Sequence, residues 1–228
     1  MNKTVMTINI ITIFPDFFKS SISFSILKRA QEKGLIKFNI YNLRDWSKDN
    51  YKTIDDRPYG GGPGMIMMIE PVYAALKSLN FPSNVIVPSA KGKLWNQKIA
   101  YEFSQLSEIT FIVPHFEGID ERVIESLADH EISVGEYILS GGELPTITMI
   151  DTIARLIPGV LGNPKSLKEE SYNSLSDISS TSSLQKEYPQ YTRPSKFVKD
   201  NGDVLEVPKV LLNGNHKEIQ EWRQKLTL

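Results

Sequence analysis

A glycine-rich segment, residues 133–145, contains the residue types best suited to hold a small ligand. It reads Ser-Val-Gly-Glu-Tyr-Ile-Leu-Ser-Gly-Gly-Glu-Leu-Pro. Glycine permits backbone angles closed to other residues and lets a flat ligand approach backbone N–H and C=O groups directly. One alternative is that Gly141 and Gly142 only build a turn. Their neighbours Tyr137 and Ser140, which we expect to be exposed, favour a ligand-binding loop.

A second glycine-rich segment, residues 55–65, reads Asp-Asp-Arg-Pro-Tyr-Gly-Gly-Gly-Pro-Gly-Met. Its glycines and prolines exclude the interior of a helix or strand, so we expect a long loop. A phosphate cradle is one interpretation, although the Gly-Lys-Ser/Thr ending of a nucleoside-triphosphate loop is missing. A flexible connector is the other, which the stiffening prolines disfavour. Arg57 is the expected phosphate or base contact because its guanidinium is planar and always charged.

The elements that must position these loops alternate between strand and helix. We predict strands at residues 8–13, 35–41, 84–88 and 110–113, and helices at 15–33, 70–79, 94–106, 119–128 and from the Gly141-Gly142 turn to about residue 157. This alternation predicts an α/β fold with a mainly parallel sheet and helices on both faces.

Three segments follow buried stretches of chain and carry candidate binding residues: residues 87–90, 113–118 and 135–142. Ligands of open α/β sheets bind at the carboxyl ends of the strands. We therefore expect a single ligand to contact all three segments.

The composition excludes several classes of function. With 228 residues the chain can form one sizeable core plus a small appendage. A net charge of −1 gives no overall field toward nucleic acid or a membrane, so a polyanionic partner needs a local basic patch. The lack of cysteine excludes disulfides and thiolate metal sites and fits a cytoplasmic setting. Residues 8–14 are too short an apolar run for a membrane span or signal peptide and are expected to form the buried first strand.

Five motifs follow one another along the chain. They are the Asp-Asp-Arg-Pro-Tyr-Gly-Gly-Gly-Pro-Gly-Met-Ile-Met-Met run (55–68), Glu-Gly-Ile-Asp-Glu-Arg-Val (117–123), the 133–145 segment, Ile-Pro-Gly-Val-Leu-Gly (157–162) and Tyr-Thr-Arg-Pro (191–194). In type and order they closely resemble the bacterial tRNA (guanine-N1)-methyltransferase family of the SPOUT superfamily. The resemblance runs from the first strand to about residue 222.

The resemblance implies methylation of N1 of guanosine 37 in tRNA, beside the anticodon, with S-adenosyl-L-methionine as methyl donor. It also implies a C-terminal trefoil knot in the α/β domain and an obligate homodimer whose active site is shared between subunits. The residues that it implies for the donor are Pro88, Ser89, Pro114, Phe116, Glu117, Gly118, Ser133, Val134, Gly135, Tyr137, Ile138, Leu139, Ser140, Gly141, Gly142 and Pro145. Those expected to bind the substrate are Asp55, Arg57, Tyr59, Gly60, Gly61, His115 and Arg193. No metal ligand is expected, and whether Mg²⁺ assists is left open.

Methylation of N1 requires the loss of its proton, which a carboxylate base and a cation facing O6 would promote. Arg155 matches the family's catalytic arginine, with a surface helix arginine as the alternative. The family's Glu-Asp-Ser-Phe reads Glu-Glu-Ser-Tyr at residues 169–172, so Glu170 is the expected base. Its extra methylene moves the carboxylate by about one carbon–carbon bond. Glu169 and Asp177 are the next candidates.

Other positions beside the expected donor site leave alternatives open. Pro114 has no backbone N–H, so a donor contact there must come from its carbonyl. His115 either touches an RNA phosphate or simply lies at the surface, and the second is slightly favoured. Glu117 either binds the amino group of the donor or pairs with Arg122.

We predict a knotted methyltransferase domain at residues 1–165, a flexible Ser-rich linker at 166–188 and a small, mainly helical tRNA-binding domain at 189–228. A helix at 215–226 offers cationic side chains for phosphates, with a solvated charged face as the alternative. This domain is shorter than the family's, which would weaken tRNA affinity. The linker is expected to become ordered with donor and RNA and so to bring Glu170 into place.

Two other functions compete with the methyltransferase. A catalytically impaired RNA-binding relative of the same fold is suggested by Glu170, Pro114 and the short C-terminal domain. Without the resemblance, the triple-glycine loop would also suit an enzyme that binds a sugar nucleotide or a phosphate.

Overall fold

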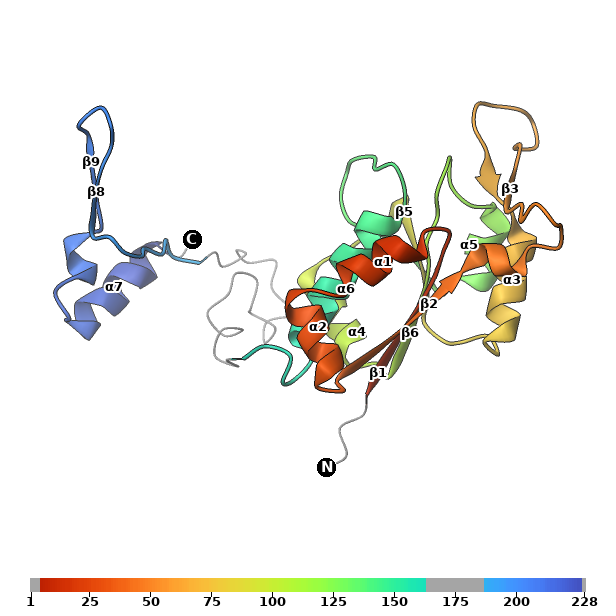
Figure 1. Cartoon of the computed structure of the whole chain (residues 1–228). Helices are drawn as coiled ribbons and strands as arrows, with labels where there is room; N and C mark the ends of the chain where they lie inside the picture. The colour runs from red at the N-terminus through yellow and green to blue at the C-terminus, as the bar shows by residue number, and fades with distance from the viewer. Residues whose placement is uncertain (1–4, 163–186, 227–228) are drawn as a thin grey trace. The chain divides into compact units, whose positions relative to one another are not determined.

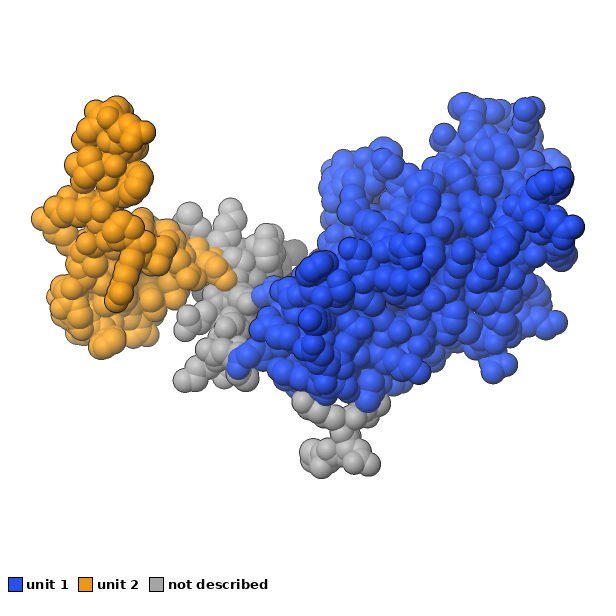
Figure 2. All heavy atoms as spheres, viewed as in Figure 1, with its two compact units in different colours: residues 1–162 blue, residues 163–228 orange. Residues whose placement is uncertain are grey.

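The computed structural model describes residues 5–162 and 187–226. The chain divides into two compact units, residues 1–162 and 163–228, coloured separately in Figure 2. Most of the predicted linker lies outside the described residues, as do the candidate bases Glu169, Glu170 and Asp177.

The first unit is built on one parallel sheet. Its five strands lie in the order β2 (Ile36–Asn42), β1 (Met6–Thr12), β6 (Glu108–Ile112), β5 (Val85–Leu94) and β7 (His130–Ser133). The first strand pairs in parallel with β2 from Met6 opposite Ile36 to Thr12 opposite Asn42, and it pairs in parallel with β6 on its other edge. The predicted α/β fold with a parallel sheet is confirmed.

Helices cover both faces of the sheet (Figure 1). One face carries α1 (Pro15–Ser21), α2 (Ser25–Glu32), α4 (Gln97–Ser104) and α6 (Glu143–Leu156), and the other carries α3 (Ile69–Ser78) and α5 (Glu121–Leu127). Successive side chains of a strand point to opposite faces. Accordingly, Ile10 packs into the core under α1, α2, α4 and α6, whereas Ile11 packs into the core under α3 and α5.

The single helix predicted at residues 15–33 is wrong, because the structure has two helices with a break at residues 22–24. Serine side chains satisfy backbone groups at the break. The Ser21 hydroxyl donates to the carbonyl of Phe17 and the Ser23 hydroxyl to that of Ser20. Such local bonds compete with the helical pattern.

The prediction for residues 84–106 is also wrong in its boundaries. Strand β5 continues to Leu94, and α4 begins only at Gln97, where the Asn96 side chain accepts the N–H of Ile99 and caps the helix. The unpredicted strand β7 explains the longer β5. Pro88 and Lys93 both lie opposite Ile132, so residues 89–92 bulge out of the sheet.

The described residues of the second unit form a small β-hairpin and a helix. The hairpin pairs β8 (Lys196–Val198) with β9 (Val204–Glu206), and a 3-10 turn η3 (Lys209–Leu211) leads to α7 (His216–Leu226). The predicted helix at 215–226 is confirmed, whereas the hairpin was not predicted. None of residues 187–226 is buried. In the described parts of both units, no helix combines the length and the apolar character that crossing a bilayer requires.

Candidate active site

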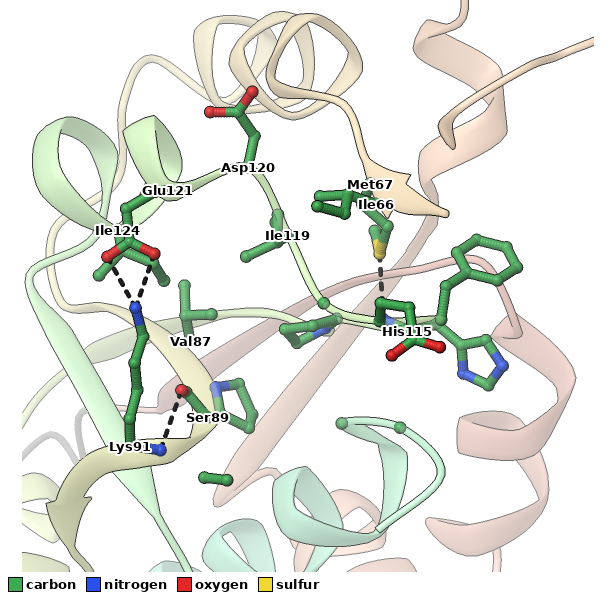
Figure 3. Close-up of a pocket in the computed structure, with 18 of the residues that line it drawn as sticks. Ile66, Met67, Val87, Ser89, Lys91, His115, Ile119, Asp120, Glu121 and Ile124 are labelled. Atoms are coloured by element: carbon green, nitrogen blue, oxygen red, sulfur yellow. Dashed lines mark hydrogen bonds and ion pairs between the residues drawn. The ribbon is translucent and has the colours of Figure 1, made fainter. Parts of the chain in front are cut away.

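The three predicted ligand-binding segments meet at one large cavity of about 1290 Å³ in the first unit (Figure 3). Its walls include residues 87–91 after the buried part of β5, residues 114–122 after β6 and most of residues 133–142 after β7. All three segments lie at the carboxyl ends of parallel strands, which is where open α/β sheets bind ligands. The sheet therefore brings together segments that are far apart in the sequence.

The Gly141-Gly142 turn is pressed against the segment after β6. The Gly142 N–H donates to the carbonyl of Pro114 at 2.7 Å. A Cβ on Gly142 would lie 2.7 Å from Cδ and 3.0 Å from the carbonyl oxygen of Pro114. Glycine is required here for space rather than for unusual backbone angles, since Gly142 has a helical φ of −79°. The interpretation that these glycines only form a turn is therefore incomplete.

Tyr137, Ile138 and Leu139 stand at the cavity with exposed side chains. Ser133 lies at the end of β7 and is buried, and its hydroxyl donates to the Gly135 carbonyl at 3.0 Å. The expected exposure of Tyr137 is confirmed, with 56% of its surface accessible. This loop thus offers both backbone groups and apolar side chains to a ligand.

The segment after β6 joins the cavity to the second glycine-rich loop. The Glu117 N–H donates to the Met65 carbonyl, and the Met67 N–H donates to the Gly118 carbonyl, each at 3.0 Å. Asp120 then caps α5, its carboxylate accepting the Arg122 N–H at 3.0 Å. Figure 3 shows Met67 beside His115, whose N–H donates to the methionine sulfur at 3.1 Å.

The second glycine-rich loop connects the two strands of a short antiparallel pair, β3 (Asp55–Asp56) and β4 (Ile66–Met67), beside the cavity. Arg57 and Tyr59 line the cavity, and Tyr59 is fully exposed. Gly60 and Gly61 have φ values of +84° and +83°, and a Cβ at either position would meet nothing within 4 Å, so these glycines serve the backbone turn. They do not line the cavity, and neither does Asp55, which pairs with Met67.

A charged cluster forms one end of the cavity. Lys91 Nζ lies 2.6 and 2.8 Å from the two carboxylate oxygens of Glu121 (Figure 3). It also lies 3.9 Å from Glu131 Oε1. The Glu121 hydrogen bond is the main cause that raises the pKa of Lys91. Nearby, the bidentate Arg122 guanidinium lowers the pKa of Asp120. Since Arg122 pairs with Asp120, the suggested pairing of Glu117 with Arg122 is not supported.

A second, smaller cavity of about 580 Å³ adjoins the same loops. It is lined mainly by apolar side chains near α1 and the start of α6, and it contains Ser140, one of the residues predicted to bind the donor. His115, Leu139 and Gly141 line both cavities, so they form the wall between them.

Other predicted site residues lie elsewhere. Arg155 is half-buried near the end of α6 and lines neither cavity. Burial raises the pKa of Asp151, which lies one turn earlier on the same helix, and the positive charge of Arg155 opposes this shift. Arg193 is an exposed residue of the second unit. Glu170 lies outside the described residues.

Sequence reasoning missed several cavity residues. Lys91, Glu121 and Glu131 of the large cavity were not singled out. Neither was Glu143, the buried first residue of α6, which lines the smaller cavity. Glu121 sits in one of the five motifs, but the contact to Lys91 spans 30 positions and has no local signal. Glu131 belongs to the strand that was not predicted.

A family model described as "tRNA (Guanine-1)-methyltransferase TrmD" matches residues 6–228, nearly the whole chain. The chain belongs to the tRNA (guanine-N1)-methyltransferase family. The suspected resemblance is thereby confirmed.

Relatives in this family match nearly all of this chain and more than four fifths of their own length. A tRNA (guanine-N(1)-)-methyltransferase of Dictyoglomus turgidum is 47% identical over 225 residues, which cover 98% of this chain and 86% of that protein. One from Carboxydothermus hydrogenoformans is 48% identical over 226 residues, covering 98% and 83%. A crystal structure of the tRNA (m1G37) methyltransferase from Aquifex aeolicus matches with a TM-score of 0.75 and 33% identity, over 96% of this chain and 87% of that one.

The family depends on S-adenosylmethionine, and the cavity is suited to such a ligand. Adenosylmethionine carries an adenine edge, a ribose and a sulfonium, which backbone N–H and C=O groups of closely packed glycine loops can contact. Within the described ranges, no group of three or more His, Cys, Asp or Glu side chains is placed to hold a metal ion.

Proposed function

We propose that this enzyme transfers the methyl group of S-adenosyl-L-methionine to N1 of guanosine 37 in tRNA. The observation that carries the proposal is the single cavity at the ends of β5, β6 and β7, in a chain of the tRNA (guanine-N1)-methyltransferase family. The match to a tRNA (m1G37) methyltransferase supports position 37. A tRNA substrate also fits a cytoplasmic enzyme.

The size of the cavity supports two ligands side by side. Pockets for small molecules usually measure about 300–1,000 Å³. At about 1290 Å³ this cavity exceeds that range and has room for the donor and a flipped-out nucleobase. The backbone after β7 would hold the adenine, and the segments after β5 and β6 would hold the ribose and the methionine end.

Two residues acquire clearer roles in this proposal. Glu117 has an exposed side chain at the cavity, so its carboxylate is available for the donor's amino group. The Pro114 carbonyl is already bonded to Gly142, so Pro114 serves the donor by holding the glycine turn in place. When bound, the donor supplies a methyl group on a sulfonium that leaves as a neutral thioether, and the protein's task is mainly orientation.

Arg155 and Glu170 are proposed to act on the guanine, Arg155 at O6 and Glu170 as the base for the N1 proton. At about 1.5 Å rise per residue, Arg155 lies about 15 Å along α6 from Pro145, the residue of this helix that lines the large cavity. An arginine side chain does not span this distance. We therefore infer that Arg155 serves the cavity of a second subunit in a homodimer, which agrees with an active site shared between subunits; the trefoil knot is proposed from family membership alone.

The exposed loop at residues 57–61 is the proposed contact for the anticodon region. Tyr59 offers an aromatic face for base stacking and Arg57 a planar cation for phosphate or base. Arg193 and the cationic side chains of α7, among them Lys217, Arg223 and Lys225, would hold the tRNA from the second unit. Whether Mg²⁺ takes part is decided by the assay below with and without EDTA.

The test is transfer of a radiolabelled methyl group into tRNA transcripts with guanosine at positions 36 and 37, against transcripts with adenosine at 37. We expect labelling of the first alone and its loss in Glu170→Gln. Retained activity in Glu170→Gln would indicate that Glu169 or Asp177 is the base instead. Tight binding of both donor and tRNA without transfer would favour the catalytically impaired relative.

Mixed dimers test the shared site. One subunit of the heterodimer carries Arg155→Ala and has a cavity that still binds the donor. The other subunit keeps Arg155 but has a cavity altered so that it cannot bind the donor. The one working cavity can then receive Arg155 only from the partner subunit. We expect the heterodimer to regain part of the activity that both homodimers lack. No recovery would place Arg155 at its own subunit's cavity or outside catalysis.

A further inference from the structure

The side chains of His115 and Glu143 form a pair that the proposed mechanism does not use. His115 Nδ1 lies 3.2 Å from Oε1 and 3.4 Å from Oε2 of the carboxylate. Glu143 is buried, with 9% of its surface accessible, and His115 is partly buried. A buried carboxylate needs a polar partner because its desolvation is costly, and here the imidazole provides one.

The imidazole ring is held in place from several sides. The ring of Phe14 packs edge-on at 4.9 Å between centroids, and the ring of Phe116 packs edge-on at 5.2 Å. The backbone N–H of His115 donates to the sulfur of Met67. The ring therefore has little freedom to turn away from Glu143.

The pair connects two walls of the donor cavity. His115 belongs to the segment after β6, and Glu143 begins α6 immediately after the Gly141-Gly142 turn. A Cβ on Gly141 would lie 2.5 Å from His115 Nδ1, so the turn rests directly on the pair. The Gly142 N–H bond to Pro114 joins the same two walls at the backbone.

We propose that the His115–Glu143 pair is a latch that positions the glycine turn for the methyl donor. His115 is then a positioning residue, not a contact for RNA phosphate. This inference rests on the proposed donor site and adds to it the residues that hold the turn in place.

The latch predicts a specific kinetic effect. In His115→Ala the turn loses its side-chain contact with the segment after β6 and keeps only the backbone bond from Gly142 to Pro114, so donor binding must pay to order it. We expect the KM for S-adenosylmethionine to rise about tenfold, or 1.4 kcal/mol. The kcat at saturating donor and the KM for tRNA should stay within about twofold, because groups that act on the guanine are unchanged.

Conservative variants separate positioning from general structural damage. In His115→Asn the side-chain amide can still donate to Glu143, so the donor KM should return close to the wild-type value. Glu143→Gln keeps an acceptor but loses the charge and should be intermediate. Glu32→Gln, which removes a charge from an exposed pair on α2, is the matched control and should leave the donor KM unchanged.

The experiment measures donor binding by calorimetry, both KM values, and thermal unfolding without donor for each variant. A tenfold donor effect with rescue by His115→Asn supports the latch. An unchanged donor KM in His115→Ala overturns it, as does a raised tRNA KM with a reduced salt dependence, which would mark a phosphate contact. If wild-type protein fails to bind S-adenosylmethionine at all, the proposed donor site itself is refuted.

Discussion

The two glycine-rich loops look alike in sequence but use glycine for different physical reasons. In the loop after β7, Gly142 has ordinary backbone angles and no room for a side chain. In the loop between β3 and β4, Gly60 and Gly61 have positive φ and open space around them. The first loop is a packed wall of the cavity, whereas the second is an exposed structure free to meet a large partner. This difference suggests the donor for the first loop and tRNA for the second.

The largest effect that the comparison predicts is for Gly142→Ala. The new methyl group would collide with the ring carbon Cδ of Pro114 and crowd its backbone oxygen and nitrogen, and overpacking of this kind costs about 1–3 kcal/mol. We expect a lower unfolding temperature and a donor Kd raised by more than about tenfold, measured by calorimetry. Gly162→Ala, where nothing lies within 4 Å, is the matched control. Equal unfolding temperatures and equal donor Kd values in the two variants would contradict the claim that Gly142 is required for close packing.

Next comes Tyr59→Ala in the second loop. Tyr59 is fully exposed, so its removal should not change stability, whereas loss of base stacking costs about 1–3 kcal/mol per base. The KM for tRNA should rise about tenfold at constant donor Kd. Tyr51→Ala removes another highly exposed tyrosine, which lines neither cavity, and should have no effect. A donor Kd that rises in Tyr59→Ala would contradict the separation of the two loops.

A smaller effect is expected for Asp120, which ends the segment that joins the two loops. Asp120→Ala removes the cap of α5, at a cost of about 1 kcal/mol. The Arg122 pair lowers the pKa of Asp120, so its stabilisation is present above the unfolded-state pKa and is lost as the pH falls through the lower folded-state value.

Thermal unfolding at neutral and at strongly acid pH measures this prediction. Asp120→Ala should melt about 2–4 °C lower at neutral pH, with a smaller difference in acid. Asp120→Asn keeps the helix cap and should lose only the part of the stabilisation that depends on the charge of the carboxylate. A difference that grows as the pH falls would have the wrong sign and refute the assignment.

The smallest effect concerns Asp151 on α6, the helix that begins at the packed loop. Burial raises its pKa, so its contribution to stability is greatest below the unfolded-state pKa and declines as the pH rises through the folded-state value. Asp151→Asn should therefore melt about one degree higher than wild type at neutral pH and at the same temperature in acid. A less stable variant at neutral pH would show that attraction to Arg155 outweighs burial.

Much of the fold could be predicted from local patterns. Apolar runs predicted β1, β5 and β6, because strands buried on both faces are almost continuously apolar. Alternation of apolar and polar residues predicted β2, the partly buried edge strand. The strand β7 was missed, since its His130 and Glu131 give a four-residue element no apolar run. The break after α1 was missed because the hydroxyls of Ser21 and Ser23 donate to backbone carbonyls in ways that periodicity does not record.

Part of the candidate site could likewise be predicted from the sequence, and part could not. The glycine content of the loops, and their positions directly after predicted strands, predicted that they would contact one ligand. The pairs His115–Glu143 and Lys91–Glu121 join residues about 30 positions apart, and their contact depends on the order of strands in the sheet. The distance of Arg155 from the cavity likewise follows from the length and direction of α6, which its residue type does not reveal.

The most direct test of the account is to locate the methyl group on the RNA. Purified enzyme, saturating S-adenosylmethionine and a transcript with guanosine at 36 and 37 should give 1-methylguanosine at position 37 alone, detected by mass spectrometry of nuclease fragments. The Gly142→Ala variant should give much less product at low donor concentration. Donor binding without any methylated guanosine, or a methyl group at another position, would contradict the central claim.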